Sequence, residues 1–115
     1  MPNPLVHLEL WTKSPKAIAD FYARAFDWKV REFGNAAYWM VESGDGGATL
    51  GVFTPEKGTW PGNMAGYIRV PDLARALEGI RAAGGTVLVE RQDVPNVGAF
   101  ALFRDPDGRV MGLWQ

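Results

Sequence analysis

Two residues near the start of the chain have side chains that could carry out acid–base chemistry. His7 and Glu9 lie two positions apart in the segment VHLELW (6–11), which alternates in polarity as a β-strand does. Because successive side chains of a strand point to opposite faces, His7, Glu9 and Trp11 are expected to share one face. An imidazole beside a carboxylate can act as a general base with an orienting acid, or supply two ligands to a metal ion.

A simpler interpretation gives this pair no catalytic role. Glu9 is then the counter-ion of Arg69 or another arginine, and His7 is a hydrogen-bonded histidine in a pocket wall. Pairs of this kind are common in proteins without catalysis. The sequence leaves both interpretations open.

Other kinds of chemistry find no support in the composition. The 115 residues include no cysteine and one histidine, which excludes disulfides, thiolate chemistry and a zinc–thiolate site, and leaves no Ser/His/Asp set. A net charge of −1 with dispersed basic residues argues against nucleic-acid binding. Without a basic leader or an apolar run of about 20 residues, we expect a cytoplasmic protein that does not enter membranes.

The same order of elements is predicted twice. Strand 6–11, a helix after Ser14, and strands at 28–33, 36–42 and 48–54 form the first half. A connection at 55–63 leads to strand 65–69, a helix after Asp72 that ends at Gly84–Gly85, and strands at 86–90, 98–103 and 110–115. The motif DPDG (105–108) is expected to be a β-turn, because its spacing lacks the oxygen donors of a calcium loop.

The two halves align residue by residue. An offset of 58 places Ala65 on His7, Tyr67 on Glu9 and Arg69 on Trp11. This repeat predicts an α+β protein in which two tandem βαβββ modules, at about 5–54 and 64–115, form one domain over 1–115.

The segments VHLEL, SPKAIADFYARAFDWKV, AGYIRVPDLARALEGIRAAGGTV and VPNVGAFALFRDPDGRVMGLWQ resemble the vicinal oxygen chelate (glyoxalase/bleomycin resistance/dioxygenase) superfamily over nearly the whole chain. The resemblance implies curled mixed sheets and a homodimer. In metal-dependent members, four positions supply ligands, and here they fall on His7, Gly51, Ala65 and Gly112. Because three of these four have no donor side chain, we expect no cofactor, and a divalent metal at His7 only with non-standard ligands.

Strand alternation and the repeat together predict a ligand-binding face. It comprises His7, Glu9, Trp11, Phe53, Tyr67, Arg69 and Trp114. We expect the two glycines at former ligand positions to open space on this face. Aromatic walls with a few polar groups suit an aromatic or amphipathic organic ligand.

Three classes of function remain open at this point. The first, which the missing metal ligands favour, is a small-molecule-binding protein of the glyoxalase/bleomycin-resistance type without the usual metal site. The second is a lyase/isomerase or dioxygenase-like enzyme, with a degenerate or intersubunit metal site or with metal-free acid–base catalysis by His7 and Glu9. The third is an interaction module whose aromatic face forms the dimer interface.

Overall fold

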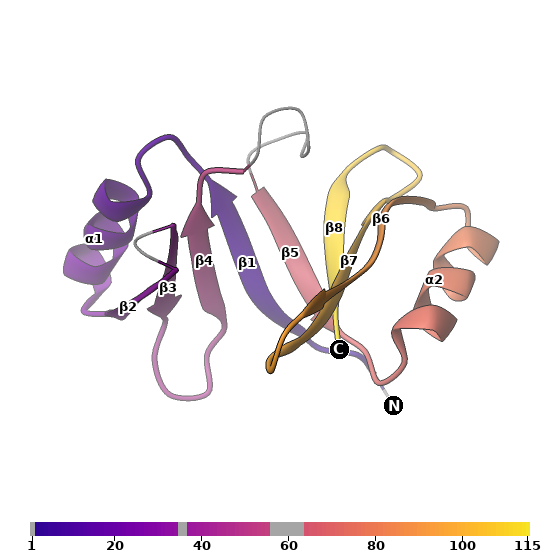
Figure 1. Ribbon diagram of the computed structural model, residues 1–115, viewed down its shortest axis with the longest axis horizontal. Helices are drawn as coiled ribbons and strands as arrows, with labels where there is room; N and C mark the ends of the chain where they lie inside the picture. Colours follow the sequence, from indigo (N-terminus) through magenta and orange to yellow (C-terminus); the bar gives the residue numbers. More distant parts are fainter. Residues whose placement is uncertain (1, 35–36, 56–63) are drawn as a thin grey trace. The chain divides into compact units, whose positions relative to one another are not determined.

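A computed structural model describes residues 2–34, 37–55 and 64–115. The elements follow one another as β1 (Leu5–Trp11), α1 (Pro15–Phe26), β2 (Lys29–Phe33), β3 (Tyr38–Glu42), β4 (Thr49–Phe53), β5 (Met64–Arg69), α2 (Leu73–Ala82), β6 (Thr86–Val94), β7 (Gly98–Arg104) and β8 (Val110–Trp114) (Figure 1). This order confirms the α+β class and the two βαβββ modules.

The chain folds as two compact units. Val6–Ala65 form the N-terminal unit, and Gly66–Gln115 with the N-terminal residues up to Leu5 form the C-terminal unit. The N-terminal unit has strand order β2-β3-β4-β1, and the C-terminal unit has β6-β7-β8-β5. In each unit the three consecutive strands are antiparallel, and the last of them pairs in parallel with the first strand of the module. The predicted meanders are therefore confirmed.

Helix α1 covers one face of the N-terminal sheet. Ala19 is fully buried and packs with Val41, Leu50 and Val52, while Leu8, Leu10 and Trp39 add to the same core. Pro15 stands at the start of the helix, where its missing N–H costs no hydrogen bond. Ser14 occupies the N-cap position of this helix, but its side chain makes no capping hydrogen bond. Because α1 covers one face of this sheet, only the opposite face is left uncovered by the helix.

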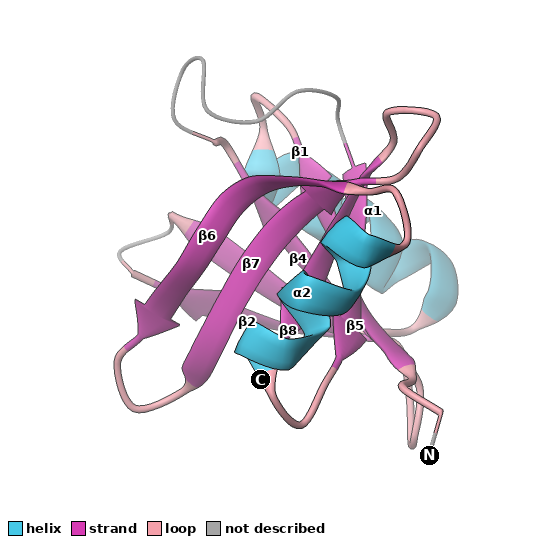
Figure 2. Cartoon of the chain, turned by 90° about the vertical axis from the view of Figure 1, so that its right-hand side faces the viewer, coloured by secondary structure: helices cyan, strands magenta, loops and turns pink. Residues whose placement is uncertain are grey.

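Helix α2 covers the C-terminal sheet in the same way, and Figure 2 shows it lying along β7. Asp72 caps it, since its Oδ1 accepts a hydrogen bond from the Arg75 backbone N–H at 3.2 Å. Leu73 and Leu77 are buried against a core whose other members are Val70, Ala99, Ala101 and Leu113. Gly84 follows the helix with a positive φ of 98°, which confirms the predicted glycine end.

Strand registers confirm the repeat at single-residue level. Glu9 lies opposite Gly51 across the β1–β4 pair, and Tyr67 lies opposite Gly112 across β5–β8. Likewise, Trp11 faces Phe53, and their counterparts Arg69 and Trp114 face each other.

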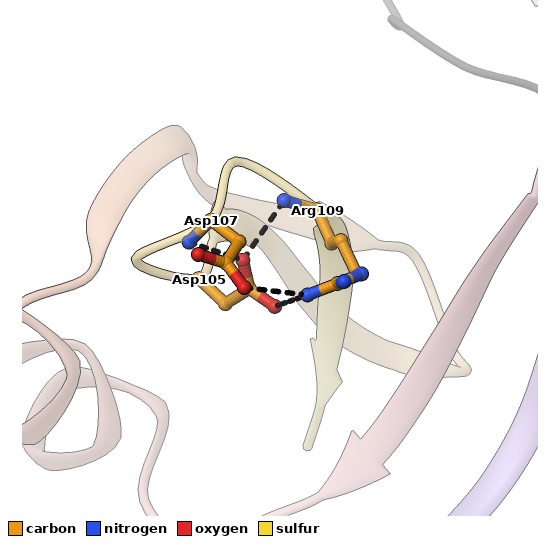
Figure 3. A network of polar contacts seen from close by, with 3 residues as sticks. All are labelled: Asp105, Asp107 and Arg109. Atoms are coloured by element: carbon orange, nitrogen blue, oxygen red, sulfur yellow. Dashed lines mark hydrogen bonds and ion pairs between the residues drawn. The ribbon is translucent and has the colours of Figure 1, made fainter.

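The acidic DPDG segment is a turn, as predicted, and Figure 3 shows its side chains. The Asp105 carboxylate accepts hydrogen bonds from the backbone N–H groups of Asp107 and Arg109, each at 2.9 Å. The Arg109 backbone N–H is the largest influence that lowers the pKa of Asp105, and the Asp107 N–H and the Arg109 charge act in the same direction. The carboxylate is thus used to close the turn.

Residues 56–63, which make up most of the predicted connection, lie outside the described residues. Strand β6 runs to Val94 and is longer than predicted. Among the described residues, neither helix is long and apolar enough to cross a membrane.

Candidate functional site

The face of the N-terminal sheet away from α1 carries side chains in three cross-strand rows. Directly opposed residues in neighbouring strands point to the same side, so the registers define each row. The rows, read from β2 through β3 and β4 to β1, are Phe33, Tyr38, Phe53 and Trp11; Arg31, Met40, Gly51 and Glu9; and Lys29, Glu42, Thr49 and His7. An aromatic row therefore borders a row containing a glycine and a carboxylate, with the histidine beyond.

His7 and Glu9 are joined by a tyrosine from another strand. The Tyr38 hydroxyl donates to Glu9 Oε2 at 3.0 Å and lies 2.9 Å from His7 Nε2. The other imidazole nitrogen, Nδ1, lies 2.6 Å from Thr49 Oγ1. The side chains of His7 and Glu9 are only 16% and 12% exposed, so these hydrogen bonds are made in a largely dehydrated environment.

The direction of these hydrogen bonds fixes where the imidazole carries its proton. Tyr38 has one hydroxyl hydrogen, which it donates to Glu9, so it must accept from His7 Nε2–H. In neutral His7, Nδ1 then accepts from the Thr49 hydroxyl. Nε2 consequently has no lone pair to offer a metal ion.

Tyr38 remains a neutral phenol in this environment. Burial is the largest influence that raises the pKa of Tyr38 well above its ordinary value, and the charge of Glu9 and its hydrogen bond add to it. The hydroxyl therefore keeps its proton and donates a hydrogen bond to Glu9. It does not readily form the phenolate that could bind a metal ion.

The two glycines at former ligand positions correct a prediction, because a tyrosine fills the space beside each. A Cβ placed on Gly51 would overlap the Tyr38 hydroxyl and lie 2.8 Å from His7 Nε2. A Cβ placed on Gly112 would overlap the Tyr67 ring, with Cζ at 2.8 Å. The prediction of open space beside these glycines is wrong, because the Tyr38 hydroxyl fills it at Gly51 and the Tyr67 ring fills it at Gly112.

The residues present do not fit the usual metal site of the resembled superfamily. Gly51, Ala65 and Gly112 offer no donor side chain, and His7 Nε2 is hydrogen-bonded to Tyr38. In the described part of the chain, no three His, Cys, Asp or Glu side chains gather as a metal site requires.

The other predicted ligand-binding residues lie in different environments. In the N-terminal unit, Phe53 is half-buried and stacks on Tyr38 with ring centroids 5.4 Å apart, whereas Trp11 is buried. In the C-terminal unit, Tyr67 is buried, Trp114 half-buried and Arg69 exposed. The structure thus brings His7, Glu9, Trp11 and Phe53 onto one sheet face.

Tyr38 is the residue that the sequence interpretation missed. It belongs to a predicted strand, and its counterpart in the C-terminal unit is Phe100, since both face the last aromatic residue of the neighbouring strand. Only the register between β3 and β4 places Tyr38 beside Gly51. That register depends on the turn at 43–48, whose hydrogen bonding the sequence does not specify.

Comparison with known proteins places this geometry in a family. The profile of the Glyoxalase/Bleomycin resistance protein/Dioxygenase superfamily matches residues 5–111. The provisionally named glyoxylase CFP32 of Mycobacterium tuberculosis (strain CDC 1551 / Oshkosh) is 30% identical over 112 residues, which are 95% of this chain and 42% of the relative. The chain thus spans less than half the length of that relative.

Solved structures share the fold at low sequence identity. A superfamily member from Vibrio splendidus 12B01 matches with a TM-score of 0.70 at 12% identity, covering 99% of each chain. Methylmalonyl-CoA epimerase from Mycobacterium tuberculosis matches with a TM-score of 0.74 at 12% identity, covering 96% of this chain and 85% of that chain. The chain therefore belongs to the Glyoxalase/Bleomycin resistance protein/Dioxygenase superfamily.

Proposed function

We propose that the chain is a small-molecule-binding protein that takes an aromatic or amphipathic organic ligand without the metal site common in its superfamily. The observation that carries this proposal is the arrangement of rows on the N-terminal sheet face. The aromatic row that contains Tyr38 lies directly beside Glu9, and the Tyr38 hydroxyl joins the row to Glu9 and His7 through hydrogen bonds.

The aromatic row supplies the apolar part of such a site. Phe33, Tyr38 and Phe53 are side by side on three strands, and the two described ring planes of Tyr38 and Phe53 are tilted by only 30°. Aromatic faces provide large contact area with little loss of conformational freedom, which favours planar or amphipathic ligands.

The carboxylate of Glu9 determines which polar group we expect on the ligand. Glu9 is a carboxylate in a largely buried position, and a carboxylate accepts hydrogen bonds from donors or cations. We therefore propose that the ligand turns a donor or cationic group towards Glu9 and its apolar part towards Phe53.

Dye binding to metal-free protein tests this proposal. After treatment with EDTA, the protein is titrated with acridine orange, a planar aromatic cation, and with 1-anilinonaphthalene-8-sulfonate, a planar aromatic anion. We expect saturable binding of the cation at one site per chain, and weaker binding of the anion because Glu9 repels it.

Two phenylalanine variants locate the dye. Phe53→Leu should weaken binding about tenfold, because it removes an aromatic contact. The control Phe21→Leu changes an exposed residue of α1 on the other side of the sheet and should leave the affinity unchanged. Equal losses in both variants, or binding that requires an added divalent metal, would contradict the proposal.

The geometry also favours a second candidate, metal-free acid–base catalysis. His7 Nε2 and Glu9 Oε2 are 3.6 Å apart with the Tyr38 hydroxyl between them, and methylmalonyl-CoA epimerase has the same fold. In such a reaction, Glu9 would accept a proton from carbon while Tyr38 and His7 donate hydrogen bonds to a developing oxyanion. Turnover that Glu9→Gln abolishes, while the protein stays folded, would support this candidate over binding alone.

We also propose that two copies of this chain pair in the cytoplasm. The support for this pairing is the superfamily to which the chain belongs, because the resemblance to its short members implies a homodimer. Light scattering should give a mass of two chains, and a strict monomer at high concentration would refute the pairing.

A further inference from the structure

The C-terminal unit has a sheet face of its own that points away from α2. Ala101 and Leu113 belong to the core beneath α2, so their strand neighbours Phe100 and Trp114 point to the opposite face. Arg69 lies directly opposite Trp114 across the β5–β8 pair, and Trp114 lies directly opposite Phe100 across the β7–β8 pair. An arginine, a tryptophan and a phenylalanine therefore lie side by side on three strands of this face.

A glycine in β7 makes room for the indole ring of this row. A Cβ placed on Gly98 would lie 2.8 Å from Cζ2 and 3.2 Å from Cε2 of Trp114, which is closer than a real Cβ comes to a ring. The ring thus takes the space that any other side chain would fill at position 98, and the backbone of β7 supports it. Trp114 remains half-buried, so part of it is still accessible to a small molecule.

The charge of this face is positive. Arg69 is exposed, and in the described part of the chain its guanidinium forms no ion pair, whereas Arg81 of the same unit is paired with Glu90. Arg104 points to the same face as Arg69, because it shares the alternation of β7 with Phe100. The described strands β5, β7 and β8 place no carboxylate on this face, in contrast to the Glu9 face of the N-terminal unit.

From this arrangement we infer that this face of the C-terminal unit is a second binding site, which takes a small planar aromatic carboxylate. The guanidinium of Arg69 presents a planar fork of N–H donors that matches the two oxygens of a carboxylate. The indole of Trp114 offers an aromatic surface to the ring of the same ligand. Because neighbouring strands are about 4.8 Å apart, a small molecule can contact both residues at once.

This inference goes beyond the proposed function, since it concerns the other unit and a ligand of the opposite charge. The exposure of Arg69 limits the strength of the ion pair, because solvent screens exposed charges. We therefore expect this site to bind its ligand more weakly than the largely buried Glu9 site binds a cationic dye.

Two ligands of the same shape test the inference. The protein is titrated at pH 7 and low salt with 2-naphthoate, a planar aromatic carboxylate, and with 2-naphthamide, which is neutral. Calorimetry measures the affinities, and ¹H–¹⁵N spectra follow the indole N–H signals of the five tryptophans. Trp114→Phe identifies the Trp114 signal by its absence and keeps an aromatic ring at that position.

An arginine pair separates the site from general charge effects. Arg69→Gln removes the guanidinium beside Trp114. The control Arg75→Gln removes the same charge from an exposed position on α2, on the other side of the sheet. Both arginines are exposed, so both variants are expected to fold, and far-ultraviolet circular dichroism checks this.

We expect the unsubstituted protein and Arg75→Gln to bind 2-naphthoate about three- to fivefold more tightly than 2-naphthamide. Arg69→Gln should bind the two ligands equally, and 2-naphthoate should shift the Trp114 indole signal. Raising the salt concentration should reduce the preference for the carboxylate.

Three results would overturn the inference. They are equal affinity for the two ligands in the unsubstituted protein, a preference that persists in Arg69→Gln, and a Trp114 signal that 2-naphthoate leaves unmoved. The experiment uses neither acridine orange nor a variant of the N-terminal unit, so its outcome is separate from that of dye binding.

Discussion

The two units of the chain share one element order and one strand register, yet they present different side chains on equivalent sheet positions. The row Phe33, Tyr38, Phe53 and Trp11 in the N-terminal unit corresponds to Gln92, Phe100, Trp114 and Arg69 in the C-terminal unit. His7, Glu9 and Thr49 correspond to Ala65, Tyr67 and Val110. The fold is therefore repeated, and the polar chemistry is not.

Both units fill the space beside the former ligand glycine with a tyrosine, but from opposite neighbouring strands. Tyr38 reaches Gly51 from β3, whereas Tyr67 reaches Gly112 from β5. In the first case the hydroxyl fills the space and forms hydrogen bonds, and in the second case the edge of a buried ring fills it. The space beside the glycine is thus filled by a polar hydroxyl in the N-terminal unit and by an apolar ring edge in the C-terminal unit.

The largest expected effect on stability comes from adding a methyl group at each of these two glycines. Gly112→Ala should destabilise the protein by about 3 kcal/mol, because the added methyl group overlaps the body of a buried ring that has nowhere to move. Gly51→Ala should cost less, about 1–2 kcal/mol, since the groups that must give way are the hydroxyl end of Tyr38 and the His7 imidazole, which both belong to half-buried residues. Denaturant unfolding measures both losses of stability. Equal losses would contradict the distinction between the hydroxyl beside Gly51 and the buried ring beside Gly112.

Tyr38→Phe tests directly how much the hydrogen bonds of the Tyr38 hydroxyl stabilise the protein. The change leaves the ring in place but removes the hydroxyl that serves both His7 and Glu9. Because a largely buried carboxylate then loses a hydrogen bond, the free energy of unfolding should fall by about 1–3 kcal/mol. A loss below about 0.5 kcal/mol, the usual size for surface substitutions, would show that these hydrogen bonds are weak.

The raised pKa of Tyr38 predicts a loss of stability in alkali. A tyrosine that ionises less readily when folded stabilises the protein fully below its ordinary pKa of 10.0, and this contribution is lost as the pH rises above that value. Stability measured from pH 8 to pH 11 should therefore fall more steeply in the unsubstituted protein than in Tyr38→Phe. Parallel curves would mean that the folded environment leaves the ionisation of Tyr38 unchanged.

A smaller effect is expected at Thr49, whose counterpart in the C-terminal unit is a valine. Thr49→Val removes the hydroxyl partner of His7 Nδ1 and should cost about 1 kcal/mol. Thr86→Val, at an exposed position, is the control. Because the chain has a single histidine, the ¹⁵N resonance of Nδ1 reports the lost hydrogen bond without ambiguity.

The smallest prediction concerns the ends of the two helices. Helix α1 ends at Asp27 in a left-handed conformation with φ of 58°, whereas Gly84 takes the equivalent role after α2. Asp27→Gly should stabilise the protein by about 0.5 kcal/mol, because glycine adopts a positive φ without steric strain. Gly84→Ala should destabilise it by about 1 kcal/mol for the same reason. In thermal unfolding, the melting temperature should rise for Asp27→Gly and fall for Gly84→Ala.

Much of the fold could be predicted from the sequence because its signals are local. Alternation in 6–11, the Asp72 cap and the glycines after α2 each specify an element, and the offset between halves specifies their repetition. The pairing of His7 with Glu9 on one face follows from alternation alone. What could not be predicted depends on register, since Tyr38 reaches these residues from a strand about 30 positions away. The filling of the space beside Gly51 and Gly112 was missed for the same reason.

The proton on His7 Nε2 gives the most direct test of the account, since its hydrogen bond with Tyr38 keeps Nε2 from binding a metal ion and shapes the proposed ligand site. A long-range ¹H–¹⁵N spectrum of the single histidine, recorded at neutral pH before and after one equivalent of Zn²⁺, reports that proton. The account predicts a protonated Nε2 whose resonance Zn²⁺ does not move. An unprotonated Nε2 that shifts when Zn²⁺ is added would contradict it.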